Sequence, residues 1–141
     1  MSVQAEGEWL ALAFEDAGPR GWNAGNTLTA REFGQVRADR LLGLPGRKGE
    51  HELFARSATG RKSPAEWSKL VSSIKRSGVK ETVILHRERD LVVWIYEGNH
   101  RVRAAFAAGR LVPVEISYFG NSQRQGYLFP DLPRVTAPKN P

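Results

Sequence analysis

Apolar residues at helical spacing make one segment the most clearly patterned part of the chain. Four of them recur at intervals of three and four positions, which places them on one helical face: Trp67, Leu70, Val71 and Ile74. Ser63 and Glu66 stand at the two positions of a capping box, and Gly78 is suited to a left-handed stop. We therefore expect a helix from Pro64, a favoured first residue, to about Ser77.

Two runs rich in β-branched and aromatic residues predict a β-hairpin after this helix. They cover residues 82–85 and 91–96, with a charged turn at 87–90 between them. The second run is long and apolar enough to predict a central position in a sheet.

Shorter patterns predict three further elements. Val36 and Ala38 suggest a strand from Gly34 that ends at the turn 43–46. Val102 and its apolar neighbours predict a short helix that Gly109 closes, and the alternation at 112–116 predicts a half-exposed strand.

Glycines and prolines divide the chain into three stretches. An apolar cluster at 9–14 predicts a helical turn or a short strand, and the Gly/Pro-rich residues that follow it mark 1–33 as an N-terminal extension. Residues 34–119 hold the patterned elements and form the expected domain. Residues 120–141 are polar and carry four prolines, which predicts a tail or a segment that lies over the domain.

The composition is that of one domain with an ordinary core. The 141 residues are 40% apolar and 26% charged. No apolar run reaches the roughly 18–20 residues of a membrane span, and no basic-then-apolar leader is present, so we expect a cytoplasmic protein without a membrane partner. The absence of cysteine excludes disulfides, thiolate zinc sites and cysteine catalysis.

The net charge of +6 is unevenly distributed. Four of the 15 acidic residues lie in the first 18 positions, where Lys and Arg do not occur, and the other 11 face 21 basic residues, so the remainder carries +10. A body of that sign attracts polyanions such as nucleic acid or nucleotide phosphates. The acidic stretch could fold over the basic surface and compete with nucleic acid.

The segment from Glu97 to Arg103 is the candidate site. A strand that ends in Glu97, turns at Gly98 and opens a helix directs backbone N–H groups and the positive end of the helix dipole at one point, where anions bind. Gly98 lets a phosphate approach the backbone. Side chains that can add hydrogen bonds to a phosphate follow it: Asn99, His100, Arg101 and Arg103.

These residues also carry a resemblance to a known superfamily. The Ser73-Ile74 helix end, the hairpin runs, the Gly98–Ala105 motif and Val112-Pro113-Val114 resemble the ParB N-terminal domain, ParB-like nucleases and sulfiredoxins over roughly residues 36–118. The resemblance implies a small α+β fold, a mixed sheet with a β-hairpin and short flanking helices. It also implies a nucleoside triphosphate, ATP or CTP with Mg²⁺, on the glycine turn. A second phosphate loop of the family is loosely matched by Arg47 and Lys48.

Differences between this chain and the motifs of the family exclude some of the family's activities. Sulfiredoxins have Cys where this chain has Asn99, so that reductase activity is excluded. ParB clamps have Glu-Arg-Arg after the glycine, and their DNA-binding and dimerisation domains do not fit after Tyr118. We therefore expect a ParB-like domain that binds a nucleotide, with NTPase or nuclease activity. The alternatives are a nucleotide-dependent small-molecule kinase of the free amino acid type and a catalytically idle interaction module.

Glu97 and His100 are the candidate catalytic residues. Glu97 could hold Mg²⁺, act as a base towards water or a hydroxyl, or pair with Arg101 or Arg103. Glu50 or Glu52 corresponds to the acidic base of the kinase-like members, or belongs to a solvated loop.

The other chemistry-bearing side chains divide into surface, core and stacking candidates. His51 and His86 are expected at the surface, and Trp67 and Trp94 in the core. Four aromatic residues could stack a base or pack the tail on the domain: Trp22, Tyr118, Phe119 and Tyr127.

A basic run around the long helix is the candidate DNA contact. Such a run is ordinarily a solvated helix face, and on a body of +10 it can also follow a phosphate backbone. The residues of this candidate contact are Arg61, Lys62, Lys69, Lys75 and Arg76. The expected partners are thus a nucleotide and DNA, and a homodimer is left open.

Overall fold

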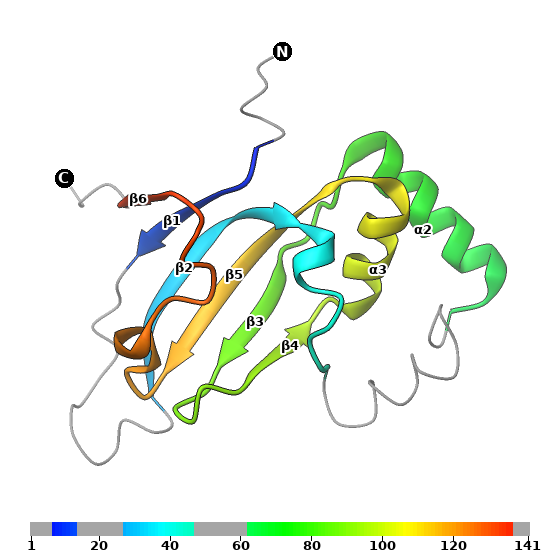
Figure 1. Ribbon diagram of the computed structural model, residues 1–141. Helices are drawn as coiled ribbons and strands as arrows, with labels where there is room; N and C mark the ends of the chain where they lie inside the picture. The colour runs from blue at the N-terminus through cyan, green and yellow to red at the C-terminus, as the bar shows by residue number, and fades with distance from the viewer. Residues whose placement is uncertain (1–6, 14–26, 47–61, 137–141) are drawn as a thin grey trace.

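One mixed sheet organises the part of the chain that the structure describes, which is residues 7–13, 27–46 and 62–136 of the computed structural model (Figure 1). Its six strands lie in the order β4-β3-β5-β2-β1-β6. The bounds of the elements are β1 Trp9–Ala13, β2 Leu28–Arg37, η3 Ala38–Arg40, α2 Pro64–Ser77, β3 Val83–Arg87, β4 Val93–Glu97, α3 Asn99–Ala108, β5 Leu111–Phe119, η4 Ser122–Gln125 and β6 Arg134–Thr136. The expected α+β class, with a mixed sheet and helices beside it, is confirmed.

Strands β2 and β5 form the centre of the sheet. They pair antiparallel along almost their whole lengths. On its other side β5 runs parallel to β3, starting at Val114 opposite Val83. Pro113, which has no N–H to donate, therefore lies just before this second ladder begins. β1 adds antiparallel to β2, and β6 adds parallel to β1.

The predicted hairpin is confirmed as β3 and β4, but the predicted central position of its second strand is wrong. Among the described strands β4 pairs only with β3 and forms an edge of the sheet. The apolar run that suggested a central strand starts with Leu91 and Val92, which are exposed in the turn. The outer side of β4 is met by the chain after η3, where the Pro45 carbonyl accepts a hydrogen bond from the Ile95 amide at 2.7 Å.

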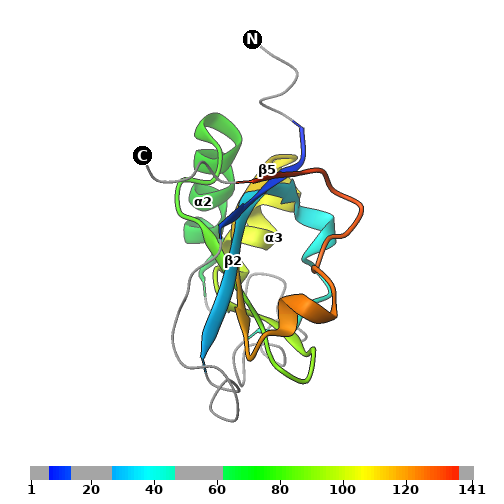
Figure 2. The same ribbon diagram turned by 90° about the vertical axis from the view of Figure 1, so that its left-hand side faces the viewer.

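The core lies on one face of the sheet. The strand residues that point to this face are buried, and Figure 2, which views the sheet from its edge, shows α3, η3 and η4 on the same side of it. Helix α2 packs against α3 and forms an outer layer (Figure 1). The buried side chains that fill the space include Val36, Val83, Leu85, Ile95, Val102, Ala105, Val112, Val114 and Ile116.

Helix α2 has the predicted bounds and the predicted capping box. The Glu66 amide donates to the Ser63 hydroxyl at 3.2 Å, and the Ser63 amide donates to the Glu66 carboxylate at 2.9 Å. Gly78 follows the helix with φ +79°. At the same end Arg110 Nη1 donates to the Lys75 carbonyl at 3.0 Å, a favourable place for a cation because the helix dipole is negative there.

The predicted division into an extension, a domain and a tail needs correction. β1 and the first part of β2 lie within residues 1–33, and β2 begins at Leu28 rather than near Gly34, so the sheet crosses that boundary. Residues 120–141 contribute η4 and β6 and bury Phe129 and Leu132 in the core. The local pattern left β1 open between a helical turn and a short strand, and it missed the start of β2, η4 and β6, because short elements are stabilised by partners far away in the sequence.

A buried carboxylate connects the centre of the sheet to its last strand. Glu32 on β2 is fully buried and accepts hydrogen bonds from the Tyr118 hydroxyl on β5 and from Arg134 Nε on β6. The Tyr118 oxygen in turn accepts from the Leu128 amide at 2.9 Å. Burial and the hydrogen bond to Glu32 raise the pKa of the Tyr118 hydroxyl well above its ordinary value, so it remains a proton donor.

Gly34 marks the closest approach of β1 to β2. A Cβ at this position would lie 1.9 Å from the Trp9 carbonyl oxygen and 2.7 Å from the Leu10 Cα, both on β1. We expect Gly34→Ala to lower the free energy of unfolding by about 1–3 kcal/mol, the usual cost of overpacking, because backbone atoms have to move. Urea denaturation followed by far-UV circular dichroism measures the change.

Gly43→Ala is the matched control for this substitution. A Cβ at Gly43 meets no atom within 4 Å, so its effect should stay within about 0.5 kcal/mol, as for ordinary surface changes. Equal stabilities of the two variants would contradict the close packing of β1 on β2.

Candidate functional site

The predicted Glu97–Arg101 turn lines an open cleft of about 390 Å³. This volume lies within the range of about 300–1,000 Å³ that is typical of small-molecule sites. The turn contributes one part of the lining, and the rest comes from a residue just before α2, a residue in the middle of α2 and the loop before β3. The lining residues are Lys62, Leu70, Glu81, Tyr96, Glu97, Gly98, Asn99, His100 and Arg101.

Gly98 connects β4 to α3 in a conformation that favours glycine. Its φ is +115°, and a Cβ there would lie 2.8 Å from Val83 Cγ2 on β3. The Gly98 carbonyl accepts from the Val102 amide at 3.0 Å, so Gly98 is the N-cap of α3. Because glycine has no side-chain oxygen, it cannot cap the first amides of the helix as Ser or Asp would. The first turn of α3 also contains no acidic residue. The positive end of the helix dipole thus points at the cleft wall.

Arg101 is held in place by the segment that leads into β3. Its Nη1 donates to the Thr82 carbonyl at 3.0 Å, and its Nη2 lies 3.9 Å from the Glu81 carboxylate. The Glu81 side chain is 81% exposed, so this ion pair is weak. The sequence predicted that the Arg101 guanidinium would bind a phosphate through two hydrogen bonds. In the structure one of its nitrogens, Nη1, already donates to the Thr82 carbonyl.

Two carboxylates, Glu81 and Glu97, line the same cleft. In the described parts of the chain His, Asp and Glu do not gather in groups of three or more that could hold a metal ion. Mg²⁺ is usually bound by one or two carboxylates together with phosphate oxygens and water.

An aromatic cluster that the sequence did not predict lies next to the cleft. His86 stacks on Tyr96, with ring centroids 4.4 Å apart and planes 6° from parallel, and Trp94 and Phe119 lie 5.2 and 4.8 Å from the His86 ring. His86, expected at the surface, is half-buried. Trp94, expected in the core, is also half-buried, and its Nε1 donates to Glu88 at 2.9 Å. The signal was the alternation in β3 and β4, which places these side chains on the sheet face away from the core.

The structure separates the predicted basic residues. Lys62 lines the cleft, whereas Lys69, Lys75 and Arg76 are exposed along α2. Arg103 is half-buried on α3 and is not among the cleft-lining residues. Seven other candidates lie outside the described residues: Trp22, Arg47, Lys48, Glu50, His51, Glu52 and Arg61.

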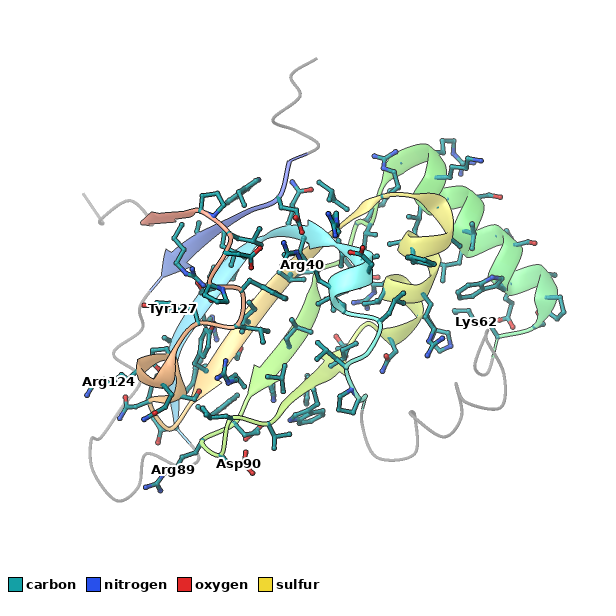
Figure 3. All side chains as sticks on the ribbon, viewed as in Figure 1. Arg40, Lys62, Arg89, Asp90, Arg124 and Tyr127 are labelled. Atoms are coloured by element: carbon teal, nitrogen blue, oxygen red, sulfur yellow. The ribbon has the colours of Figure 1, made fainter. Side chains whose placement is uncertain are left out.

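Several other cations take part in ion pairs within the fold. Arg40 contacts Glu8 at 2.6 Å and Asp131 at 2.7 Å, so one residue of the acidic N-terminal stretch already binds a basic partner. Figure 3 shows Lys62 far from Arg89 and Arg124, which lie at the other end of the sheet. The basic charge is therefore distributed over separate regions.

The other described aromatic residues that were predicted to stack a base or to pack the tail lie in contact with other parts of the fold. Tyr118 is fully buried, Phe119 joins the aromatic cluster, and Tyr127 lies under the Arg134 guanidinium at 4.1 Å from its ring centroid. Tyr118 and Tyr127 pack the C-terminal segment on the sheet, which was one of the two predicted roles. In the described residues no helix has the length and apolar character to cross a membrane.

Comparison of the chain with protein families, curated proteins and solved structures finds no match.

The environment of His86 predicts a pH-dependent stability. Burial lowers the pKa of His86 below its ordinary value of about 6.5, although Glu88 and Glu115 act in the opposite direction. The unfolded chain therefore binds this proton more readily, so stability falls as the pH drops below about 6.5 towards the folded pKa. His86→Phe keeps a ring and removes the titration. We expect the wild type to lose more unfolding free energy than His86→Phe between pH 7.5 and 5.5 in urea titrations. Parallel pH profiles of the two proteins would argue against a desolvated His86.

Proposed function

We propose that the protein binds a nucleoside triphosphate, with its phosphates at the cleft formed by Glu97–Arg101. The observation that carries this proposal is that the N-cap of α3 is a glycine, which has no side chain to cap the helix, and that this N-cap and the first turn of α3 line the cleft. Backbone amides at a helix N-terminus are a recurrent phosphate site.

The charges around the turn support a phosphate ligand. Lys62, Arg101 and His100 line the cleft and can contribute cationic or neutral N–H donors to phosphate oxygens. Glu97 and Glu81 would hold Mg²⁺ that accompanies the nucleotide, and that ion would neutralise charge on the phosphates. The two carboxylates thus suit a phosphate chain that carries its own cation.

The resemblance to the ParB and sulfiredoxin superfamily supports the same ligand. It is carried by the motif that now lines the cleft, Gly98-Asn99-His100-Arg101. Within this proposal Glu97 and His100 are the groups placed to move a proton, which allows NTP hydrolysis or nuclease activity, or phosphoryl transfer to a small hydroxyl compound. The remaining alternative is a catalytically idle interaction module. It would bind the nucleotide but release no phosphate, whether or not DNA or a hydroxyl acceptor is added.

Calorimetric titration with ATP and with CTP in the presence of Mg²⁺ tests the phosphate site. Arg101→Ala and Lys62→Ala should each weaken nucleotide binding about tenfold, which corresponds to one charge-assisted hydrogen bond of about 1.5 kcal/mol. Lys69→Ala is the matched control, because Lys69 is exposed on α2 and does not line the cleft. The phosphate site is refuted if the wild type binds neither nucleotide, or if the three variants bind equally well.

DNA contact through α2 is a second candidate function, favoured by the placement of its basic residues. Lys69 and Arg76 are seven positions apart, close to two helical turns, and lie opposite the side of α2 that packs against α3. Lys75 is exposed beside them. This outer layer of the molecule can follow a phosphate backbone.

The salt dependence of DNA binding tests this contact. Each phosphate that a cation neutralises contributes a slope of about −0.9 to the dependence of log K on log salt concentration. Replacing both Lys69 and Arg76 by alanine should make the slope shallower by about two, measured by fluorescence anisotropy with duplex DNA. Lys69→Arg with Arg76→Lys keeps the charges and should keep the slope. A slope near zero for the wild type would remove DNA from the proposal.

A further inference from the structure

We propose that the base of the bound nucleotide stacks on Tyr96, so that the phosphate cleft and the aromatic cluster form one binding site. This inference rests on the proposed function and adds where the base lies. Tyr96 belongs to both parts: it lines the cleft together with Gly98 and Arg101, and its ring stacks on His86.

A β-bulge places Tyr96 at this junction. In the pairing of β3 with β4, Leu85 lies opposite Ile95 and the next residue, Ile84, lies opposite Glu97. Tyr96 is therefore the extra residue of β4, without a register partner on β3. Bulges of this kind redirect a side chain and are common beside functional sites. Here the bulge immediately precedes the Gly98 turn.

The ring of Tyr96 is packed against two other rings and is still partly exposed to solvent. His86 lies against it at 4.4 Å, with nearly parallel planes, and the Trp94 ring meets it edge-on at 5.6 Å. Trp94 is itself held by its hydrogen bond to Glu88. Tyr96 nevertheless remains 40% exposed. A flat ring that is already packed against other rings has little conformational freedom left to lose, so stacking on it costs little further ordering.

The position relative to the cleft distinguishes Tyr96 from other exposed aromatic residues. Among the described residues Trp9 is 38% exposed and Phe106 is 56% exposed, and neither lines the cleft. A nucleotide fits both features, because it carries phosphates for the α3 N-terminus and a flat base for Tyr96. Every base has a π-face, so the stack favours a base without selecting one by hydrogen bonding.

Titration of the intact protein with ATP and with inorganic tripolyphosphate, both with Mg²⁺, separates base binding from phosphate binding. We expect Tyr96→Ala to weaken ATP binding about tenfold, a loss typical of base stacking on an aromatic side chain, and to leave tripolyphosphate binding unchanged. Tyr96→Phe keeps the ring and should bind ATP like the wild type. Phe106→Ala, an exposed aromatic residue away from the cleft, should change neither titration.

The outcomes that overturn this inference differ from those that overturn the phosphate site. The base does not stack on Tyr96 if Tyr96→Ala binds ATP like the wild type, or if its affinities for ATP and for tripolyphosphate fall equally. The phosphate site is then judged separately, from the titrations of the wild type. If the wild type binds neither ligand, the proposed function itself fails.

Tryptophan fluorescence of the wild type gives a second measurement that requires no change at Tyr96. Because the Trp94 ring is 5.6 Å from the Tyr96 ring, a base stacked there should alter Trp94 emission. ATP should change the emission more than saturating tripolyphosphate does, and Trp94→Phe should abolish the difference. Equal changes with both ligands would overturn the placement of the base.

Discussion

The buried Glu32 carboxylate is the constraint on which the rest of the structure depends. A charge without partners in the interior is very costly, so Glu32 requires both the Tyr118 hydroxyl and the Arg134 guanidinium. These groups belong to β2, β5 and β6, and the Tyr118 oxygen also accepts from the Leu128 amide. The last described strand, β6, and the segment before it are thereby coupled to the central strands. Their ordering and the burial of Glu32 therefore depend on one another.

The candidate site lies at the edge of the sheet opposite β6, where β4 is the last strand. With β2 and β5 in the centre and β1 and β6 beyond them, the hairpin completes the other side and β4 becomes the edge strand. A central β4 would have had neighbours on both sides at the bulge. As an edge strand it can bulge at Tyr96, turn at Gly98 and start α3 where the cleft opens. The edge position, which contradicted the expectation from hydrophobicity, is thus what makes a site at this turn accessible.

The proposed nucleotide site combines features that are weak when taken singly. A helix N-terminus, a cleft-lining lysine, a partly engaged arginine and two carboxylates each occur in proteins with other functions. Here they line one cleft of about 390 Å³, and the exposed ring of a packed aromatic cluster lines it too. The family resemblance rests on the same Gly-Asn-His-Arg turn, and the confirmed α+β fold is compatible with it.

Local chemistry made part of this structure predictable from sequence. The capping box, the apolar face of α2, the hairpin and the glycine turns at 98 and 109 depend on residues within a few positions of one another, and each was found where it was expected. The sequence also identified the residues of the candidate turn. It did not determine the terminal strands, the edge position of β4 or the stack of His86 on Tyr96. These depend on pairing between segments far apart in the chain, and the energy of such pairing appears only when the tertiary structure brings the partners together.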